Sequence, residues 1–206
     1  MTTLEQKYYN SIKSIFIGRK IVEVFYEELN YETKLEYWEY SNHIHSIDMN
    51  LIFKLDNGEL IQIKWDNEFY PYGIGFKKLQ ELNFRNEVKT INVTSNQNWK
   101  TLLQKEITSI KVFWDISEIK RITTTKMFFF KFSKTKKITI KIPQSWEIEF
   151  ENSKIWVSAL EIIDESKANF WTDHLTLFFN KNSTEEFNLF KDISTQQSIT
   201  KKSKFE

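Results

Sequence analysis

The sequence predicts an α+β fold that is predominantly β, with two similar antiparallel-sheet halves that are each led by a short helix. Residue choice is the first reason: the 206 residues include 18 Phe, 7 Trp and 8 Tyr but only two alanines, and strands favour aromatic and β-branched side chains. The second reason is a series of short runs in which apolar and polar residues alternate. The third is a helix-start signal at residue 2 that recurs at residue 94, so internal duplication is a hypothesis.

The first half, residues 1–93, is expected to begin with a helix. Thr2 and Glu5 have the spacing of a capping box, and apolar residues follow them at helical intervals. Asn57-Gly58 stands between two alternating apolar runs, which is the strongest short-range signal of a β-hairpin. The further elements expected here are a strand at Lys20–Tyr26, a hairpin of Leu51–Gly58 with Glu59–Trp65, a helix at Phe76–Leu82 and a strand at Val88–Val93.

The second half, residues 94–165, is expected to repeat this order. Thr94 and Gln97 again have capping-box spacing. The polar cluster Ser133–Lys136 separates two apolar-rich runs and has the composition of a turn. The expected elements are a strand at Ile107–Trp114, a hairpin of Met127–Phe132 with Lys137–Ile142, and a hairpin of Trp146–Ser153 with Lys154–Ser158.

Residues 166–206 are expected to form a C-terminal extension. The run Leu175–Phe179 predicts a strand, and Ser183 stands where it could cap a short helix at Glu185–Phe190. From Thr195 to the end the residues are almost all polar. A disordered tail is therefore expected there.

Composition excludes several classes of protein. The absence of Cys excludes a disulfide scaffold, and only four Gly leave no glycine-rich loop of the kind that cradles phosphate. Lys+Arg 29 against Asp+Glu 28 gives a net charge of +1, so no overall field favours nucleic acid or a membrane. The N-terminus lacks the apolar region of a secretory signal, and no apolar run approaches the roughly 20 residues of a membrane helix. We therefore expect a cytoplasmic protein without membrane contact or cofactor.

The three histidines support one enzymatic hypothesis. His43-Ile-His45 on a strand would place both imidazoles on one face, as metal sites often require. Asp48 follows closely, and His174 is the third histidine. This set predicts a metal-dependent or hydrolytic enzyme. The competing interpretation is a pair of half-exposed histidines at a loop-to-strand boundary, because neither an H-E-x-x-H frame nor a G-x-S-x-G elbow is present.

Charge is balanced in sum but segregated along the chain. Acidic and aromatic residues interleave over residues 27–40, the acidic-aromatic segment, and basic residues interleave with phenylalanines over residues 126–141, the basic hairpin. Aromatic anchors within charged rims are typical of protein interfaces. The residues expected to contact a partner are Glu27, Glu28, Tyr31, Glu32, Glu36, Tyr37, Trp38, Glu39, Lys131, Lys134, Lys136 and Lys137.

The basic hairpin is open to three interpretations. It could bind a protein partner, as the interface pattern indicates. Basic residues with aromatics also suit nucleic acid, which is a less favoured alternative. The third interpretation needs no partner, because lysines along strand edges keep sheets from aggregating.

Three features together resemble small, uncharacterised β-rich bacterial proteins of the toxin-immunity type. They are Ile17-Gly-Arg-Lys20, the hairpin from Asp48 to Gly58, and Trp65-Asp66 after it, all within Ile17–Ile74. The resemblance implies a non-enzymatic protein-binding module that neutralises a bacterial toxin by occlusion, and it carries no catalytic residues. Binding of another protein is therefore the leading hypothesis, with the enzyme and the nucleic-acid-binding protein as alternatives and the oligomeric state left open.

Overall fold

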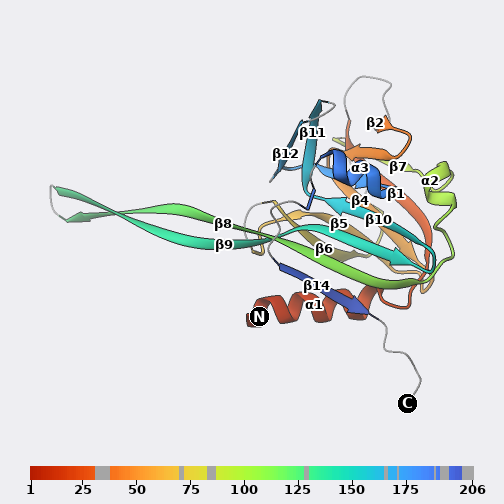
Figure 1. Ribbon diagram of the computed structural model, residues 1–206, viewed down its shortest axis with the longest axis horizontal. Coiled ribbons are helices and arrows are strands. Elements are labelled where there is room, and N and C mark those ends of the chain that lie inside the picture. The colour runs from red at the N-terminus through yellow and green to blue at the C-terminus, as the bar shows by residue number, and fades with distance from the viewer. Residues whose placement is uncertain are drawn as a thin grey trace, which may run out of the picture.

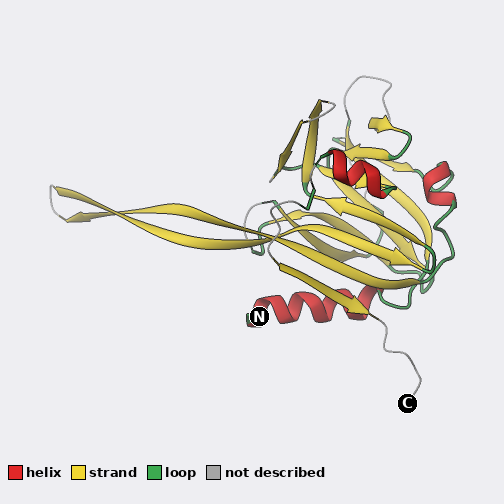
Figure 2. Ribbon diagram, viewed as in Figure 1, coloured by secondary structure: helices red, strands yellow, loops and turns green. Residues whose placement is uncertain are grey.

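The computed structural model describes residues 1–30, 38–69, 72–82, 87–127, 130–164, 167–170, 172–187, 189–190 and 195–200. Its fold is α+β and predominantly β, as predicted, with three helices and antiparallel sheets in the described ranges (Figure 1 and Figure 2). Within those ranges, no helix has the length and apolar content that crossing a membrane requires.

Helix α1 (Thr3–Phe16) starts at the predicted capping box. The backbone N–H of Glu5 donates to Thr2 Oγ1 at 3.2 Å, and the Glu5 carboxylate accepts from the Thr2 N–H at 2.9 Å. These two bonds satisfy donors that have no partner inside the first turn. The buried face of the helix consists of Glu5, Tyr8, Tyr9, Ile12 and Phe16.

The first sheet has five strands in the order β6-β5-β4-β1-β7. The predicted Asn57-Gly58 turn joins two of them, and Gly58 has a φ of 83°, a left-handed conformation that glycine adopts without strain. The helix expected at Phe76–Leu82 is wrong, because residues 76–79 belong to a strand that pairs with β5 along its whole length. The strands are β1 (Ile21–Leu29), β4 (Asn50–Leu55), β5 (Leu60–Asp66), β6 (Gly73–Leu79) and β7 (Val88–Asn92).

The second sheet has seven strands in the order β14-β8-β9-β10-β13-β3-β2, and β11 (Leu160–Asp164) pairs separately with β12 (Lys167–Phe170). Residues 195–200 of the expected tail form β14, which pairs with β8, while residues 201–206 lie outside the described residues. The seven strands are β2 (Trp38–Ser41), β3 (Ile44–Ile47), β8 (Ile107–Met127), β9 (Phe130–Phe150), β10 (Ser153–Ser158), β13 (Leu175–Phe178) and β14 (Thr195–Thr200).

Two short helices have N-caps two and three residues away from the predicted ones, Thr94 and Ser183. The N-cap of α2 (Gln97–Lys100) is Asn96, while Thr94 instead accepts a hydrogen bond from the backbone N–H of Val24 at 2.9 Å. Helix α3 (Lys181–Glu186) is capped by Asn180, whose side chain accepts from the Ser183 N–H. Both caps are asparagines, which are as effective in this position as serine or threonine.

One hydrophobic core joins both sheets and α1. It includes residues of both predicted halves, among them Phe53 and Trp146, and Leu175 from the predicted C-terminal extension. Tyr8 of α1 connects the sheets directly: its hydroxyl donates to the Ile74 carbonyl of β6 at 2.6 Å and accepts from Trp146 Nε1 of β9 at 2.8 Å. The halves therefore share a core, while the boundaries at 93 and 165 and the internal duplication stay predictions.

A long two-stranded ribbon leaves this core. Strands β8 and β9 are 21 residues each, and beyond the body of the molecule they continue as an isolated pair (Figure 1). The predicted turn at Ser133–Lys136 is wrong, because Met127 pairs with Phe130 and residues 133–136 lie within β9. We call residues 116–141 the arm and the remaining residues the body.

Candidate functional site

The base of the arm is firmly held by the body. Lys141 Nζ lies 3.0 Å from the buried carboxylate of Glu5 and 4.7 Å from the ring centroid of Trp114, which is fully buried. Burial acts to raise the pKa of Glu5, but the hydrogen bond and charge of Lys141, with the Thr2 N–H, leave that pKa lowered. The Glu5 carboxylate is thus ionised beside Lys141, and the arm is tied to α1 where it leaves the body.

A β-bulge marks the point of departure. Phe113 pairs with Ser145 but Trp114 pairs with Pro143, so Gln144 is an extra residue in β9. The backbone of Gln144 is still held, because its carbonyl accepts from the Ala159 N–H at 3.0 Å. Bulges bend a strand and increase its twist. Here the bulge lies between the sheet-bound part of the ribbon and the part that projects.

The arm concentrates positive charge. Its eight basic residues and one acidic residue, Glu118, give it a formal charge of +7, so the remaining residues carry −6 of the total of +1. The register also sets like charges directly opposite each other: Lys120 pairs with Lys137, Arg121 with Lys136 and Lys126 with Lys131. Like charges directly opposite across two strands destabilise the pairing.

Four lysines of the arm have exposed side chains, namely Lys120, Lys134, Lys136 and Lys137. Strand alternation places Lys120 and its partner Lys137 on one face of the ribbon and Lys134 and Lys136 on the other. Glu118 offsets little of this charge, because its ion pair with Lys137 is 3.4 Å long and both side chains are mostly exposed. Both faces of the ribbon are therefore positive.

The acidic-aromatic segment is only partly described. Tyr31, Glu32, Glu36 and Tyr37 lie outside the described residues. Trp38 begins β2, and Lys131 lies in β9. Glu39 is in β2 with its side chain 44% exposed and its Oε1 3.3 Å from His45 Nε2.

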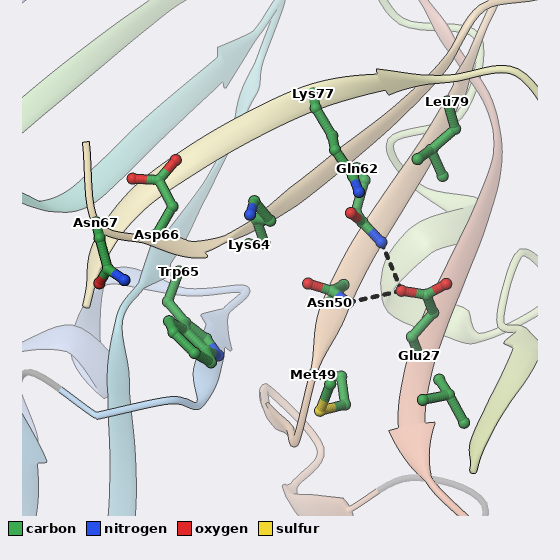
Figure 3. A pocket seen from close by; sticks show the side chains of 11 residues that line it. Glu27, Met49, Asn50, Gln62, Lys64, Trp65, Asp66, Asn67, Lys77 and Leu79 are labelled. Atoms are coloured by element: carbon green, nitrogen blue, oxygen red, sulfur yellow. Dashed lines mark hydrogen bonds between the residues drawn. The ribbon is translucent and has the colours of Figure 1, made fainter. Parts of the chain in front are cut away.

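Glu27 lies in a pocket on the first sheet instead of on an open surface. The pocket has a volume of about 320 Å³, and its lining includes Lys64 and Lys77. Glu27 is 4% exposed, and its Oε2 accepts hydrogen bonds from Asn50 Nδ2 and Gln62 Nε2, both at 2.6 Å (Figure 3). The carboxylate is thus held by two side-chain amides from neighbouring strands.

Glu28 points to the opposite face of β1 and is also buried, with 6% exposure. Burial raises its pKa to about 8, although the Asp48 N–H donates to its Oε2 at 3.2 Å. Asp48 Oδ1 in turn lies 3.3 Å from His174 Nε2. The hydrogen bond with His174 lowers the pKa of Asp48, and the same bond raises the pKa of His174. The three groups form a chain of a neutral acid, a carboxylate and an imidazole.

The expectation that His43 and His45 share one strand face is wrong. His43 is exposed in a turn, whereas His45 is in β3, has no exposed surface and lies 2.7 Å from the Tyr26 hydroxyl through Nδ1. Burial lowers the pKa of His45, an effect that Glu39 opposes. His174 has separate partners, Asp48 and Asp173. In the described part of the chain, no three His, Cys, Asp or Glu side chains are grouped as metal ligands.

The feature that sequence reasoning missed is the length of the arm. Residues 117–127 are rich in β-branched Ile and Thr, which favours a strand, but their apolar residues do not alternate with polar ones as in a half-buried strand. The sequence shows the lysines of the arm, but which of them lie opposite each other depends on the strand register.

No protein-family model, curated protein or solved structure matches the chain.

Proposed function

We propose that this chain is a binding protein that holds an anionic macromolecule with its arm. The observation that supports this proposal is the opposed pairing of lysines on a ribbon that leaves the body. An isolated two-stranded hairpin is marginally stable in water. Directly opposed like charges weaken it by a further 0.2–1 kcal/mol or so for each pair. An anionic partner would remove this repulsion on binding.

The charge of the body supports a contact confined to the arm. Because the residues outside the arm sum to −6, an anionic partner is attracted by the arm and repelled by the body. Attraction of this kind speeds encounter and orients the partner before contact. A partner that surrounds the ribbon would contact both of its positive faces.

The alternatives from the sequence differ in what they require. A toxin partner, as implied by the resemblance to immunity proteins, stays a prediction. Edge protection requires lysines along exposed strand edges but no ligand. It predicts that removing the charges causes aggregation, whereas the binding proposal predicts loss of affinity for polyanions. The enzyme alternative also stays a prediction, but its histidines have the separate surroundings described above.

Retention on immobilised heparin, a generic polyanion, tests this proposal. The arm variant replaces the four exposed arm lysines with Gln, and the control variant replaces four exposed body lysines with Gln. Both lose four charges. We expect the arm variant to elute at markedly lower salt than the parent and the control variant to elute close to it. The two sets are Lys120, Lys134, Lys136 and Lys137 for the arm, and Lys7, Lys13, Lys100 and Lys167 for the body.

Two outcomes would overturn the proposal. One is a parent protein that passes through heparin at low salt without retention. The other is an equal shift of the arm and control variants, because it would mean that net charge alone determines retention. Far-ultraviolet circular dichroism of each variant shows whether the fold is kept.

A further inference from the structure

We propose that the anionic partner is double-stranded DNA and that the arm lies in its major groove. This inference rests on the proposed function and names its partner. The major groove of B-form DNA is about 12 Å wide and admits a two-stranded β-ribbon. Strands in a ribbon are about 4.8 Å apart, so the arm has the cross-section that the groove accepts.

The length of the arm also matches this site. Its β8 portion runs from Ile116 to Met127. At about 3.3 Å per residue that portion spans about 40 Å. One turn of the double helix is about 34 Å. The groove winds around the helix axis, so its path over one turn is longer than this rise. The arm can therefore follow the groove for part of one turn while the body remains outside.

Because both faces of the arm are positive, a partner that offers a groove fits the arm better than a partner that offers a flat surface. Lys120 and Lys137 occupy one face and Lys134 and Lys136 the other. A flat protein surface would neutralise one face and leave the other in water. A groove has a row of phosphates on each side, so both sets of lysines can neutralise phosphate charge.

The type of residue separates DNA from an acidic protein. Lysine is depleted in the core of protein–protein interfaces, whereas it is a principal residue for phosphate neutralisation. The arm also has the exposed threonines Thr123, Thr135 and Thr139, and a threonine hydroxyl group can donate to phosphate oxygens or base edges. Ile122 is 65% exposed in the same stretch. An apolar side chain at this position can contact the methyl group of thymine.

The test is fluorescence anisotropy with a labelled 20-base-pair DNA duplex over a range of salt concentrations. Each lysine that neutralises a phosphate adds about 0.9 to the slope of log K against log salt. We expect the arm variant (Lys120, Lys134, Lys136 and Lys137 to Gln) to lose about 3 to 4 from this slope. We expect its affinity to fall at least about 100-fold, whereas the control variant with four body substitutions changes the slope by less than about 1.

Competition locates the contact on the DNA. We expect methyl green, which occupies the major groove, to displace the protein, and distamycin, which occupies the minor groove, to leave it bound. Displacement by distamycin alone would overturn the groove assignment. A double-stranded RNA of the same sequence should bind more weakly, because its major groove is too narrow to admit the arm.

Other outcomes separate the failure of this inference from that of the proposed function. If heparin retains the protein through the arm but the DNA duplex does not bind, the partner is another polyanion and only this inference fails. Equal or tighter binding of polyglutamate would identify an acidic protein instead. Light scattering that shows self-association through the arm, with no DNA binding, would indicate that the arm binds the acidic body of a second copy. If neither heparin nor DNA binds, both proposals fail.

Discussion

Glu28, Asp48 and His174 link the stability of the protein to pH at the scale of single residues. Burial raises the pKa of Glu28 to about 8 from an ordinary value of 4.5, so the folded chain keeps a proton that the unfolded chain releases. Stability from this group is therefore present below pH 4.5 and is lost as pH rises toward 8. The pKa of His174 is raised above 6.5, so its contribution is also lost as pH rises. Asp48 has the opposite sign, because its lowered pKa gives stability that is lost only in acid.

Replacing Glu28 with Gln should flatten this dependence. The Gln side chain imitates the neutral carboxyl group and has no proton to lose. We expect the melting temperature of Glu28→Gln to be close to that of the parent at pH 5 and above it at pH 9. Thermal melts by circular dichroism between pH 5 and pH 9 measure this difference. The exposed Glu151→Gln is the control and should follow the parent. A parallel pH curve for Glu28→Gln would contradict the raised pKa.

At the scale of elements, the sequence predicted the features that a few adjacent residues determine by themselves. The Thr2/Glu5 capping box and the Asn57-Gly58 turn were found in the sequence because each is complete within a few residues. The strand at 73–79 was missed because it is fixed by pairing with β5. The polar composition of Ser133–Lys136 was misleading for the same reason: its backbone groups are paired along β8, so no turn is needed there. The exposed lysines could be predicted individually, but their opposition depends on a register that no local pattern encodes.

Helix α1 is joined to both sheets through the hydroxyl group of Tyr8. Replacing Tyr8 with Phe keeps the ring but leaves the Ile74 carbonyl and the Trp146 N–H without this partner. Each buried polar group that loses its partner costs about 1–3 kcal/mol. We expect Tyr8→Phe to lower the free energy of unfolding by about 2–4 kcal/mol in urea titrations. Tyr72→Phe is the control, because the ring of Tyr72 packs on Trp65 at 5.5 Å, and it should cost less than about 0.5 kcal/mol. Equal losses in the two variants would show that the Tyr8 hydroxyl does not connect the sheets.

At the scale of the whole molecule, the arm and the body have separate tasks. Buried apolar residues form two clusters, namely the core and a smaller cluster that includes Trp156 and Phe178. Among the described residues, neither cluster contains a residue between 115 and 139. The body is therefore expected to fold without the arm, since the burial of apolar surface that stabilises it lies elsewhere. The arm in turn is anchored to the body through the contacts of Lys141 with Glu5 and Trp114.

A variant without the arm tests this division. The pair Met127 and Phe130 closes the native ribbon, and Ser117 pairs with Ile140 ten residues nearer the body along each strand. Because hydrogen-bonded and non-hydrogen-bonded pairs alternate along an antiparallel ladder, these two pairs are of the same type. Replacing residues 118–139 with Asn-Gly should close a short hairpin in register. Because the removed residues lie outside both clusters, we expect the melting temperature to stay within about 2 °C of the parent. Retention on heparin should be lost together with the seven basic residues that this deletion removes. A variant that unfolds would show that the arm stabilises the body, and a folded variant that still binds heparin would place the polyanion site on the body.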